Sequence, residues 1–156
     1  MANPYINDQV TRTESATALG RLLADSYMLY LKTQGFHWNI VGSQFEPLHM
    51  LFQEQYSELA GAIDEIAERM RALGVKAPGS FSEFAALTSI TEETGAPAAD
   101  AMIGQLLSDH TAVSRAALQA VAAAEERGDV ATADLATQRV MQHEKVAWML
   151  GSLLQR

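Results

Sequence analysis

The strongest constraint on the fold is a run of apolar residues spaced alternately three and four positions apart. The run is Phe45, Leu48, Phe52, Tyr56, Leu59, Ile63, Ile66, Met70 and Leu73. This spacing follows the 3.6-residue period of an α-helix and predicts one long amphipathic helix. Pro47 falls in its first turn, where a missing amide costs little, and Gly74 can end it in a left-handed turn. At about 1.5 Å per residue, such a helix of roughly 30 residues is about 45 Å long.

Pairs of a hydroxyl residue and a glutamate three positions later mark the starts of other helices. Thr11 with Glu14 has this capping-box spacing and predicts a first helix that runs to about Trp38. Ser43 with Glu46 repeats the spacing just before the long helix. We therefore expect two consecutive helices joined by a short turn.

The second half of the chain shows two more long helical patterns. We expect one helix from about Ala98, ended by Gly128, and another that begins at Asp129. Ser80 with Glu83 predicts a short helix inside the long connection before Ala98. No strand-type alternation persists in the sequence.

These patterns predict an all-α chain, folded as a ferritin-like four-helix bundle with one short extra helix. The connection over residues 75–97 is long enough to cross the bundle, as in ferritin-like folds, whereas the other connections are short and join antiparallel neighbours. We expect an extended N-terminal tail at residues 1–10 and a single domain at residues 11–156.

Composition limits the partners and the location of the chain. The 156 residues carry a formal net charge of −8, which disfavours binding to a phosphate backbone and is compatible with handling cations. The sequence has no cysteine, no apolar run as long as a membrane span, and no N-terminal signal pattern. We therefore expect a cytoplasmic protein that does not enter a membrane.

The long helix also carries residues suited to binding a metal ion. At about 100° per residue, His49, Gln53, Asp64 and Glu68 fall within one arc beside the apolar stripe. Imidazole and carboxylate are ligands for iron, zinc or manganese, and side chains four positions apart on a helix can converge on one ion. His37, just before the turn into this helix, is a further candidate ligand.

One copy of the chain cannot complete this site. Fifteen positions separate His49 from Asp64, which places them about 22 Å apart along a helix. An antiparallel second copy, related by a two-fold axis near Glu58 and Leu59, would bring the histidine end of one chain opposite the carboxylate end of the other. The residues between the two ends are small enough for close approach, namely Ser57, Ala60 and Gly61.

The spacing alone leaves other interpretations open. His37 has the position of a capping or interface histidine, and the small residues also permit an ordinary helix contact. Asp64 and Glu68 have the pattern of a solvated face with Arg69 and Arg71 as partners, which contributes little stability. A helical interaction protein with a structural zinc at its dimer interface would use the same residues.

The same residues carry a resemblance to a known family. HWN at residues 37–39, a second histidine twelve positions after the first, and DEIAERMRALG at residues 64–74 resemble the Dps miniferritins, the ferritin-like DNA-binding proteins from starved cells. The expected short helix, and HEKVAWML at residues 143–150, extend the resemblance over nearly the whole chain.

The resemblance implies a function as well as a fold. It implies a hollow dodecamer that oxidises iron(II), preferably with hydrogen peroxide rather than dioxygen, and stores the ferric mineral inside, so that the cell is protected from oxidative damage. The ferroxidase centre would take His37 and His49 from one subunit and Asp64 and Glu68 from its two-fold mate, with Trp38 beside it. Zinc would be a substitute for iron at these ligands.

One position departs from the family pattern. Many members have an aspartate four residues after the second histidine, where this chain has Gln53. An amide oxygen is neutral and is a weaker iron ligand than a carboxylate, which puts the second iron position in doubt. Glu54 is the neighbouring carboxylate, but it lies about 100° further around the helix.

Other candidate residues have structural interpretations. The resemblance implies that acidic residues near the turn between the last two helices line a pore, namely Glu125, Glu126, Asp129 and Asp134. Helix capping and solvated surface charge are the alternative interpretations of these residues. His110 is interpreted as a core or interface histidine and His143 as a packing or hydrogen-bonding residue. Trp148 and the seven methionines are expected in the core.

DNA binding is the second function that the family suggests. Members that bind DNA often use a mobile, lysine-rich tail, whereas residues 1–10 here contain no Lys or Arg and the C-terminus has only Arg156. An acidic shell is repelled by the phosphate backbone. We therefore expect iron oxidation and storage, with a nucleoid-associated, DNA-compacting role as the alternative.

Overall fold

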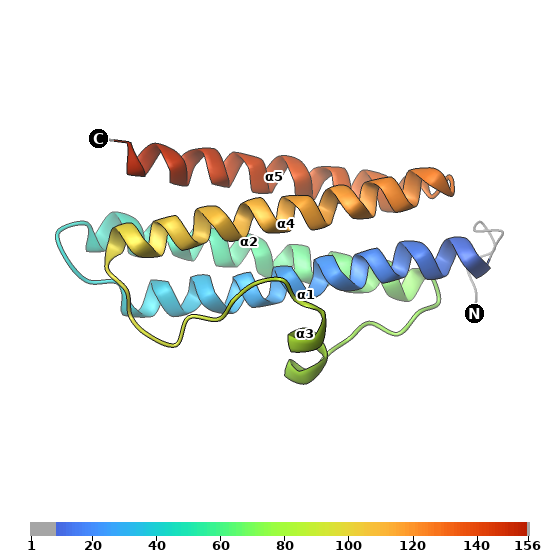
Figure 1. The fold of residues 1–156 in the computed structure, drawn as a ribbon, viewed down its shortest axis with the longest axis horizontal. Helices are drawn as coiled ribbons and strands as arrows, with labels where there is room; N and C mark the ends of the chain where they lie inside the picture. Colours follow the sequence, from blue (N-terminus) through green and yellow to red (C-terminus); the bar gives the residue numbers. More distant parts are fainter. Residues whose placement is uncertain (1–8, 156) are drawn as a thin grey trace.

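Five α-helices and no strand make up the part of the chain that the computed structural model describes, which is the backbone of residues 9–155 and the side chains of residues 12–155. The long helices are α1 (Gln9–Asn39), α2 (Phe45–Ala72), α4 (Ala99–Glu126) and α5 (Val130–Leu154). The short helix α3 (Phe81–Leu87) lies in the connection between α2 and α4 (Figure 1). This arrangement confirms the predicted fold class.

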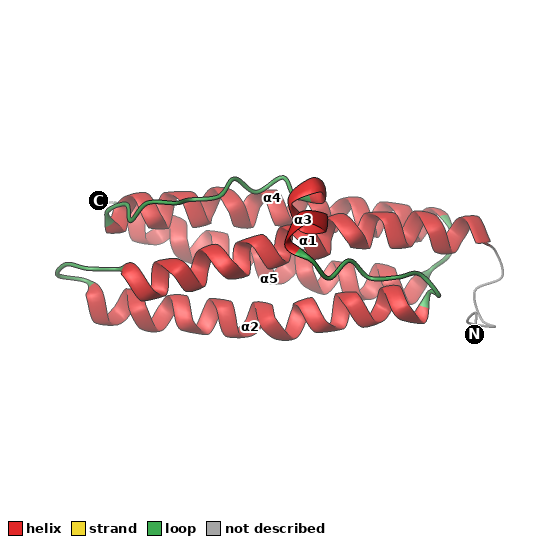
Figure 2. Ribbon diagram, turned by 90° about the horizontal axis from the view of Figure 1, so that it is seen from below, coloured by secondary structure: helices red, strands yellow, loops and turns green. Residues whose placement is uncertain are grey.

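The connection through α3 runs along the length of the bundle. In Figure 1, α2 ends at the opposite end of the bundle from the start of α4, and α3 lies beside the middle of α1. Figure 2 shows the same connection from below, passing over α1. As a result, α1 and α2 are antiparallel, α4 and α5 are antiparallel, and α2 and α4 run in the same direction.

The core forms where the apolar faces of the four long helices meet. From the predicted stripe on α2 the structure buries Leu48, Phe52, Leu59, Ile66, Met70 and Leu73. Tyr56 and Ile63 are half-buried, and Phe45 is exposed. Because full burial of one large apolar side chain contributes roughly 1.5–3 kcal/mol, this stripe is enough to fix which face of α2 points inward.

Both predicted capping boxes on the first two helices are wrong. α1 already includes residues 9 and 10, so Thr11 does not cap it, and the Glu14 carboxylate accepts hydrogen bonds from Arg127. α2 follows Gln44, which makes no side-chain cap, instead of Ser43. Helix packing outweighs local capping at these two ends. The predicted N-terminal tail otherwise falls on residues 1–8, which lie outside the described residues.

The predicted ends of the other helices are confirmed. Gly74 and Gly128 have φ values of 84° and 69°, the left-handed backbone that ends α2 and α4. The Ser80 hydroxyl accepts a hydrogen bond from the third residue of α3, and the Asp129 carboxylate accepts one from the third residue of α5. Side-chain caps therefore position the two helices that follow the long loop and the tight turn.

Several large apolar side chains that we expected in the core lie on the outside of the chain. Trp148 is 69% exposed and Met141 67% exposed, and Met50 and Met149 are also exposed. The buried methionines are Met28, Met70 and Met102. The exposed ones occupy helix faces turned away from the chain's own core, so the prediction for Trp148 and these methionines is wrong. None of the described helices combines the length and the apolar character that a membrane span needs.

Candidate metal centre

His37 and His49 form a reciprocal pair where α1 passes into α2. His37 Nδ1 lies 2.7 Å from the carbonyl oxygen of His49, and His49 Nδ1 lies 2.8 Å from the carbonyl oxygen of His37. The two rings stack, with centroids 3.7 Å apart and planes 17° apart. His37 is buried and His49 is half-buried. Each imidazole thus holds the backbone on the other side of the turn.

These hydrogen bonds fix the tautomer of both rings. A carbonyl oxygen only accepts, so each Nδ1 must carry the proton. In the neutral imidazole the lone pair is then on Nε2, the arrangement found where a histidine binds a metal ion and its other nitrogen is held by a carbonyl. The structural and the ligand interpretations of His37 are therefore compatible, because each uses a different nitrogen.

Asp64 and Glu68 lie on the second half of α2, and both are exposed. The nearby Arg69 donates to Asp129 Oδ1 at 2.7 Å, and Arg71 donates to a backbone carbonyl. Neither carboxylate forms an ion pair within the described residues. The interpretation that Asp64 and Glu68 pair with Arg69 and Arg71 is therefore wrong, because both guanidinium groups bind other partners.

The histidine pair and the carboxylate pair do not meet within one chain. Continuous helix separates His49 from Asp64 by fifteen positions, which is about 22 Å. Among the described residues, no three His, Asp or Glu side chains are grouped closely enough to hold a metal ion. The residues between the two pairs are exposed, namely Ser57, Ala60 and Gly61.

Gln53 is exposed one turn after His49. The neighbouring Glu54 lines a cavity of about 170 Å³ between α2, α4 and α5, together with Gln55 and His110. The histidine pair instead lies between α1 and α2. Glu54 therefore faces a different side of α2 from the histidine pair.

A second pair of histidines lies inside the bundle and is engaged in a buried polar chain. Arg139 donates to both carboxylate oxygens of Glu58, and its guanidinium lies 3.2 Å from His143 Nε2. Because a guanidinium only donates, His143 Nε2 accepts, and its Nδ1 donates to His110 Nδ1 at 2.9 Å. Neither ring presents a free lone pair to a metal ion, which confirms the structural interpretation of His110 and His143.

Burial makes this inner pair sensitive to acid. Burial, with a smaller effect of the positive charge of Arg139, lowers the pKa of His110 to about 3. Burial, followed by the charges of His110 and Arg139, lowers the pKa of His143 well below 6.5. The unfolded chain therefore binds more protons than the fold as the pH falls through 6.5. The stability contributed by the two neutral rings is complete above that pH and is lost progressively toward pH 3.

Thermal melts between pH 7.5 and 4.5 check this pH dependence. We expect the melting temperature to fall as the pH is lowered through this range, and to fall less steeply in a His110→Leu, His143→Leu double variant. Equal slopes for the two proteins would contradict the assignment. The upper part of the range isolates histidine titration, because most carboxylates still retain their charge there.

Asp129 is not available to line a pore. Its carboxylate caps α5 and binds Arg69, and the residue is buried. Glu125, Glu126 and Asp134 remain exposed at this end of the bundle. Of the four acidic candidates for iron traffic, Asp129 therefore has the structural role.

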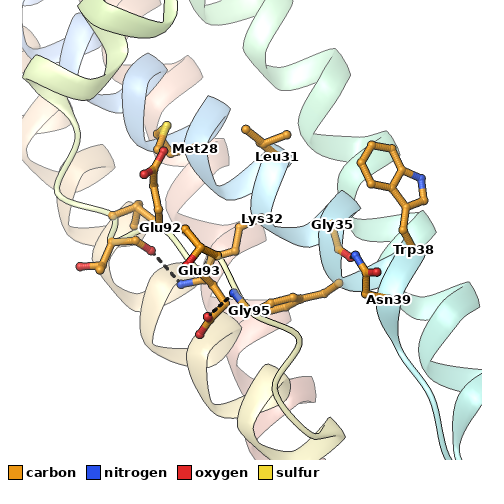
Figure 3. A pocket seen from close by; sticks show the side chains of 13 residues that line it. Met28, Leu31, Lys32, Gly35, Trp38, Asn39, Glu92, Glu93 and Gly95 are labelled. Carbon is orange, nitrogen blue, oxygen red and sulfur yellow. Dashed lines mark hydrogen bonds between the residues drawn. The ribbon is translucent and has the colours of Figure 1, made fainter.

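A cavity of about 330 Å³ lies between α1 and residues 90–95 (Figure 3). Two of its charged groups, Lys32 and Glu93, bind within the chain. Lys32 Nζ lies 2.8 Å from Asp109 Oδ2 and 3.0 Å from a backbone carbonyl, and Glu93 accepts hydrogen bonds from Gly95 and Gln105. No histidine is among the residues that line it. The cavity therefore lacks the donor atoms of the histidine pair.

Comparison with known proteins decides the family. Residues 16–156 match the model of the ferritin-like domain. DNA protection during starvation protein 2 of Bacillus anthracis is 35% identical over 136 residues, covering 87% of this chain and 93% of that protein. The chain belongs to the Dps family. An uncharacterised low temperature-induced protein of Nostoc sp. is 39% identical to this Dps protein, covering 97% of this chain and 88% of the relative.

The solved structures agree with this Dps assignment. The crystal structure of a Dps protein from Vibrio cholerae O1 matches with a TM-score of 0.94 and 32% sequence identity, over 99% of this chain and 97% of that one. That protein is described as a member of a broad superfamily of ferritin-like diiron-carboxylate proteins. The family indicated by the motif residues is confirmed.

Aromatic side chains that were not predicted from the sequence surround the histidine pair. Tyr56 lies edge-on to His37 and Phe45 stacks on His49. Tyr56 had been assigned only to the apolar stripe. Its position seven residues after His49, like that of Tyr30 seven residues before His37, is two helical turns away and so on the same face, a signal that was present in the sequence.

Proposed function

We propose that this Dps protein is a ferroxidase that oxidises iron(II), preferably with hydrogen peroxide, and stores the ferric product inside a dodecameric shell. The observation that carries the proposal is the histidine pair. Its two Nδ1 protons are bound by backbone carbonyls, which leaves Nε2 of His37 and His49 as ligand atoms. Asp64 and Glu68 of a two-fold mate supply the carboxylates.

In this centre the neutral imidazoles and the charged carboxylates have different roles. The imidazoles of His37 and His49 hold the iron ion, with ring orientations set by the carbonyl bonds. Asp64 and Glu68 bring negative charge, which stabilises iron(III) more than iron(II) and so favours oxidation. Both carboxylates are exposed and form no ion pair within the described chain, so no competing cation has to be displaced.

Zinc is a competitor under this proposal. It accepts imidazole and carboxylate donors as iron does, but it has no redox chemistry. Bound zinc is therefore expected to occupy the same ligands and to inhibit.

The shell is supported by the exposed apolar side chains. Trp38 is 62% exposed beside the histidine pair, and Trp148 and Met141 are exposed on α5. Large apolar side chains gathered on outer faces mark surfaces that other copies cover. Two-fold contacts along α2 bring together the two halves of each centre.

Protection of DNA follows from removal of iron and peroxide. The relatives are named for DNA protection during starvation. With a net charge of −8, this chain repels the phosphate backbone, and the proposal requires no contact with DNA.

Peroxide titration tests the proposed function. Protein loaded anaerobically with iron(II) is expected to consume one hydrogen peroxide for every two iron(II) ions and to release little hydroxyl radical to a spin trap. The physical reason is that two one-electron donors reduce peroxide to water without a free radical. Oxidation no faster than in buffer, or abundant trapped hydroxyl radical, would contradict the proposal.

A further inference from the structure

Two buried polar atoms face one cavity inside the bundle without a hydrogen-bond partner among the described residues. They are Nε2 of His110, a residue that is 2% exposed, and Oε1 of Gln55, which is 7% exposed. Both residues line the cavity of about 170 Å³ between α2, α4 and α5. Because a buried donor or acceptor without a partner is costly, a molecule that bonds to both atoms is favoured in this cavity.

The neighbouring side chains decide the role of each atom. The Arg139 guanidinium donates to His143 Nε2, so His143 carries its proton on Nδ1 and donates to His110 Nδ1. The low pKa that burial gives His110 keeps this ring neutral, and its proton is therefore on Nε2. The ring edge opposite the His143 contact faces the cavity, because His110 lines the cavity and His143 does not. The cavity thus offers one donor, His110 Nε2, and one acceptor, Gln55 Oε1.

This donor and acceptor select a small neutral guest. A metal ion needs the lone pair of a ring nitrogen, but His110 Nε2 carries a proton, and no three His, Asp or Glu side chains of the described chain are grouped to hold an ion. A halide ion would accept a hydrogen bond from His110 but has no hydrogen to donate to Gln55. The cavity of about 170 Å³ also exceeds the share of about 30 Å³ that one water has in the liquid. It therefore has room for a donor and acceptor larger than water.

We propose that this cavity binds hydrogen peroxide. His110 Nε2 donates a hydrogen bond to one peroxide oxygen, and a peroxide hydroxyl group donates one to Gln55 Oε1. The proposal rests on the proposed function, which makes peroxide the molecule of this class that the protein meets, and it adds a second peroxide site apart from the histidine pair. Water has the same hydrogen-bonding chemistry and is the competing occupant.

A peroxide bound here has an oxidisable neighbour, because the thioether of Met149 lines the same cavity. The sulfur lone pair attacks one peroxide oxygen and the O–O bond breaks. The hydrogen of the attacked oxygen passes to the leaving oxygen, which gives methionine sulfoxide and one water. The sulfur loses two electrons and the peroxide gains two. The hydrogen bond from His110 Nε2 stabilises the negative charge that develops on the leaving oxygen.

Peptide mass spectrometry of the iron-free whole protein after exposure to peroxide tests the site. Gln55→Leu removes the acceptor, and we expect Met149 to be oxidised about fivefold more slowly in it, which is the effect of losing one neutral hydrogen bond. Met50, an exposed methionine outside the cavity, should be oxidised at the wild-type rate. Gln142→Leu is the matched control, because Gln142 lines the cavity but has no buried atom without a partner. The rate at Met149 should be unchanged in this control.

A crystal of the iron-free wild-type protein soaked in peroxide tests the same site without a substitution. We expect density for two bonded oxygen atoms between His110 Nε2 and Gln55 Oε1. A water only at this position, or equal oxidation of Met149 in wild type and Gln55→Leu, would overturn the peroxide site and leave the ferroxidase function standing, since neither experiment contains iron. If both experiments succeed but the protein does not accelerate iron oxidation, the proposed function fails and the peroxide site stands.

Discussion

The double variant Asp64→Asn, Glu68→Gln is expected to oxidise iron(II) only at the rate measured in buffer. The change removes the two carboxylates that the proposed centre takes from the two-fold mate, and leaves neutral amides of the same shape. Both residues are exposed and form no ion pair within the described chain, so we expect stability to change by no more than about 0.5 kcal/mol. Stopped-flow absorbance after peroxide addition measures the rate.

Glu65→Gln is the matched control for this variant. Glu65 is exposed on the same helix next to Asp64, but outside the arc of candidate ligands, so its replacement should leave the oxidation rate unchanged. A double variant that oxidises iron as fast as Glu65→Gln would remove Asp64 and Glu68 from the centre.

Arg139→Met is expected to lower the free energy of unfolding by about 2–3 kcal/mol. Arg139 is buried and donates to both carboxylate oxygens of Glu58 and to His143. Methionine fills similar volume but leaves the Glu58 charge and His143 Nε2 without a donor. Because the Glu58 side chain is 37% exposed, water recovers part of the loss, and the figure lies below that of a fully buried pair.

Denaturant unfolding at one fixed protein concentration measures this effect, since assembly adds to apparent stability. Arg115→Met is the control, because Arg115 is an exposed arginine of α4 and its loss should change the transition little. Coincident unfolding curves for the two variants would show that the buried chain from Glu58 to His110 contributes nothing beyond packing.

The fold was predictable from the sequence because long helices leave a repeating signal. The apolar stripe on α2, the glycines at the ends of α2 and α4, and the cap of α3 were all recognised from spacing. The starts of α1 and α2 were not, because a capping pattern at Thr11 or Ser43 is a local preference that packing of a long helix overrides. The exposure of Trp148 was not predicted, because the apolar character of a residue does not show whether its own chain or another subunit buries it.

The residues of the candidate site were proposed from the sequence and stay a prediction, whereas the geometry of the histidine pair could not be predicted. The spacing of His49 and Asp64 on one helix already excluded a centre within one chain. The mutual hydrogen bonds between each histidine and the other's carbonyl depend on the path of the turn over residues 40–44, which no periodicity encodes. The spacing placed Tyr56 on the same face as His49, but its contact with His37 arises between two helices and required the structure.

Complementation between subunits tests the central claim, which is that each centre takes His37 and His49 from one chain and Asp64 and Glu68 from another. One variant carries His37→Ala and His49→Ala, and the other carries Asp64→Asn and Glu68→Gln. Each alone is expected to be inactive. The two are then unfolded together in equal amounts, refolded into mixed shells and assayed for iron(II) oxidation with peroxide.

Random pairing makes half of the two-fold dimers mixed, and each mixed dimer has one intact centre of two. The account therefore predicts that the mixed shells recover about a quarter of the wild-type activity. Mixed shells that assemble but stay as inactive as the separate variants would contradict it, because the two sets of ligands would then have to act within one chain.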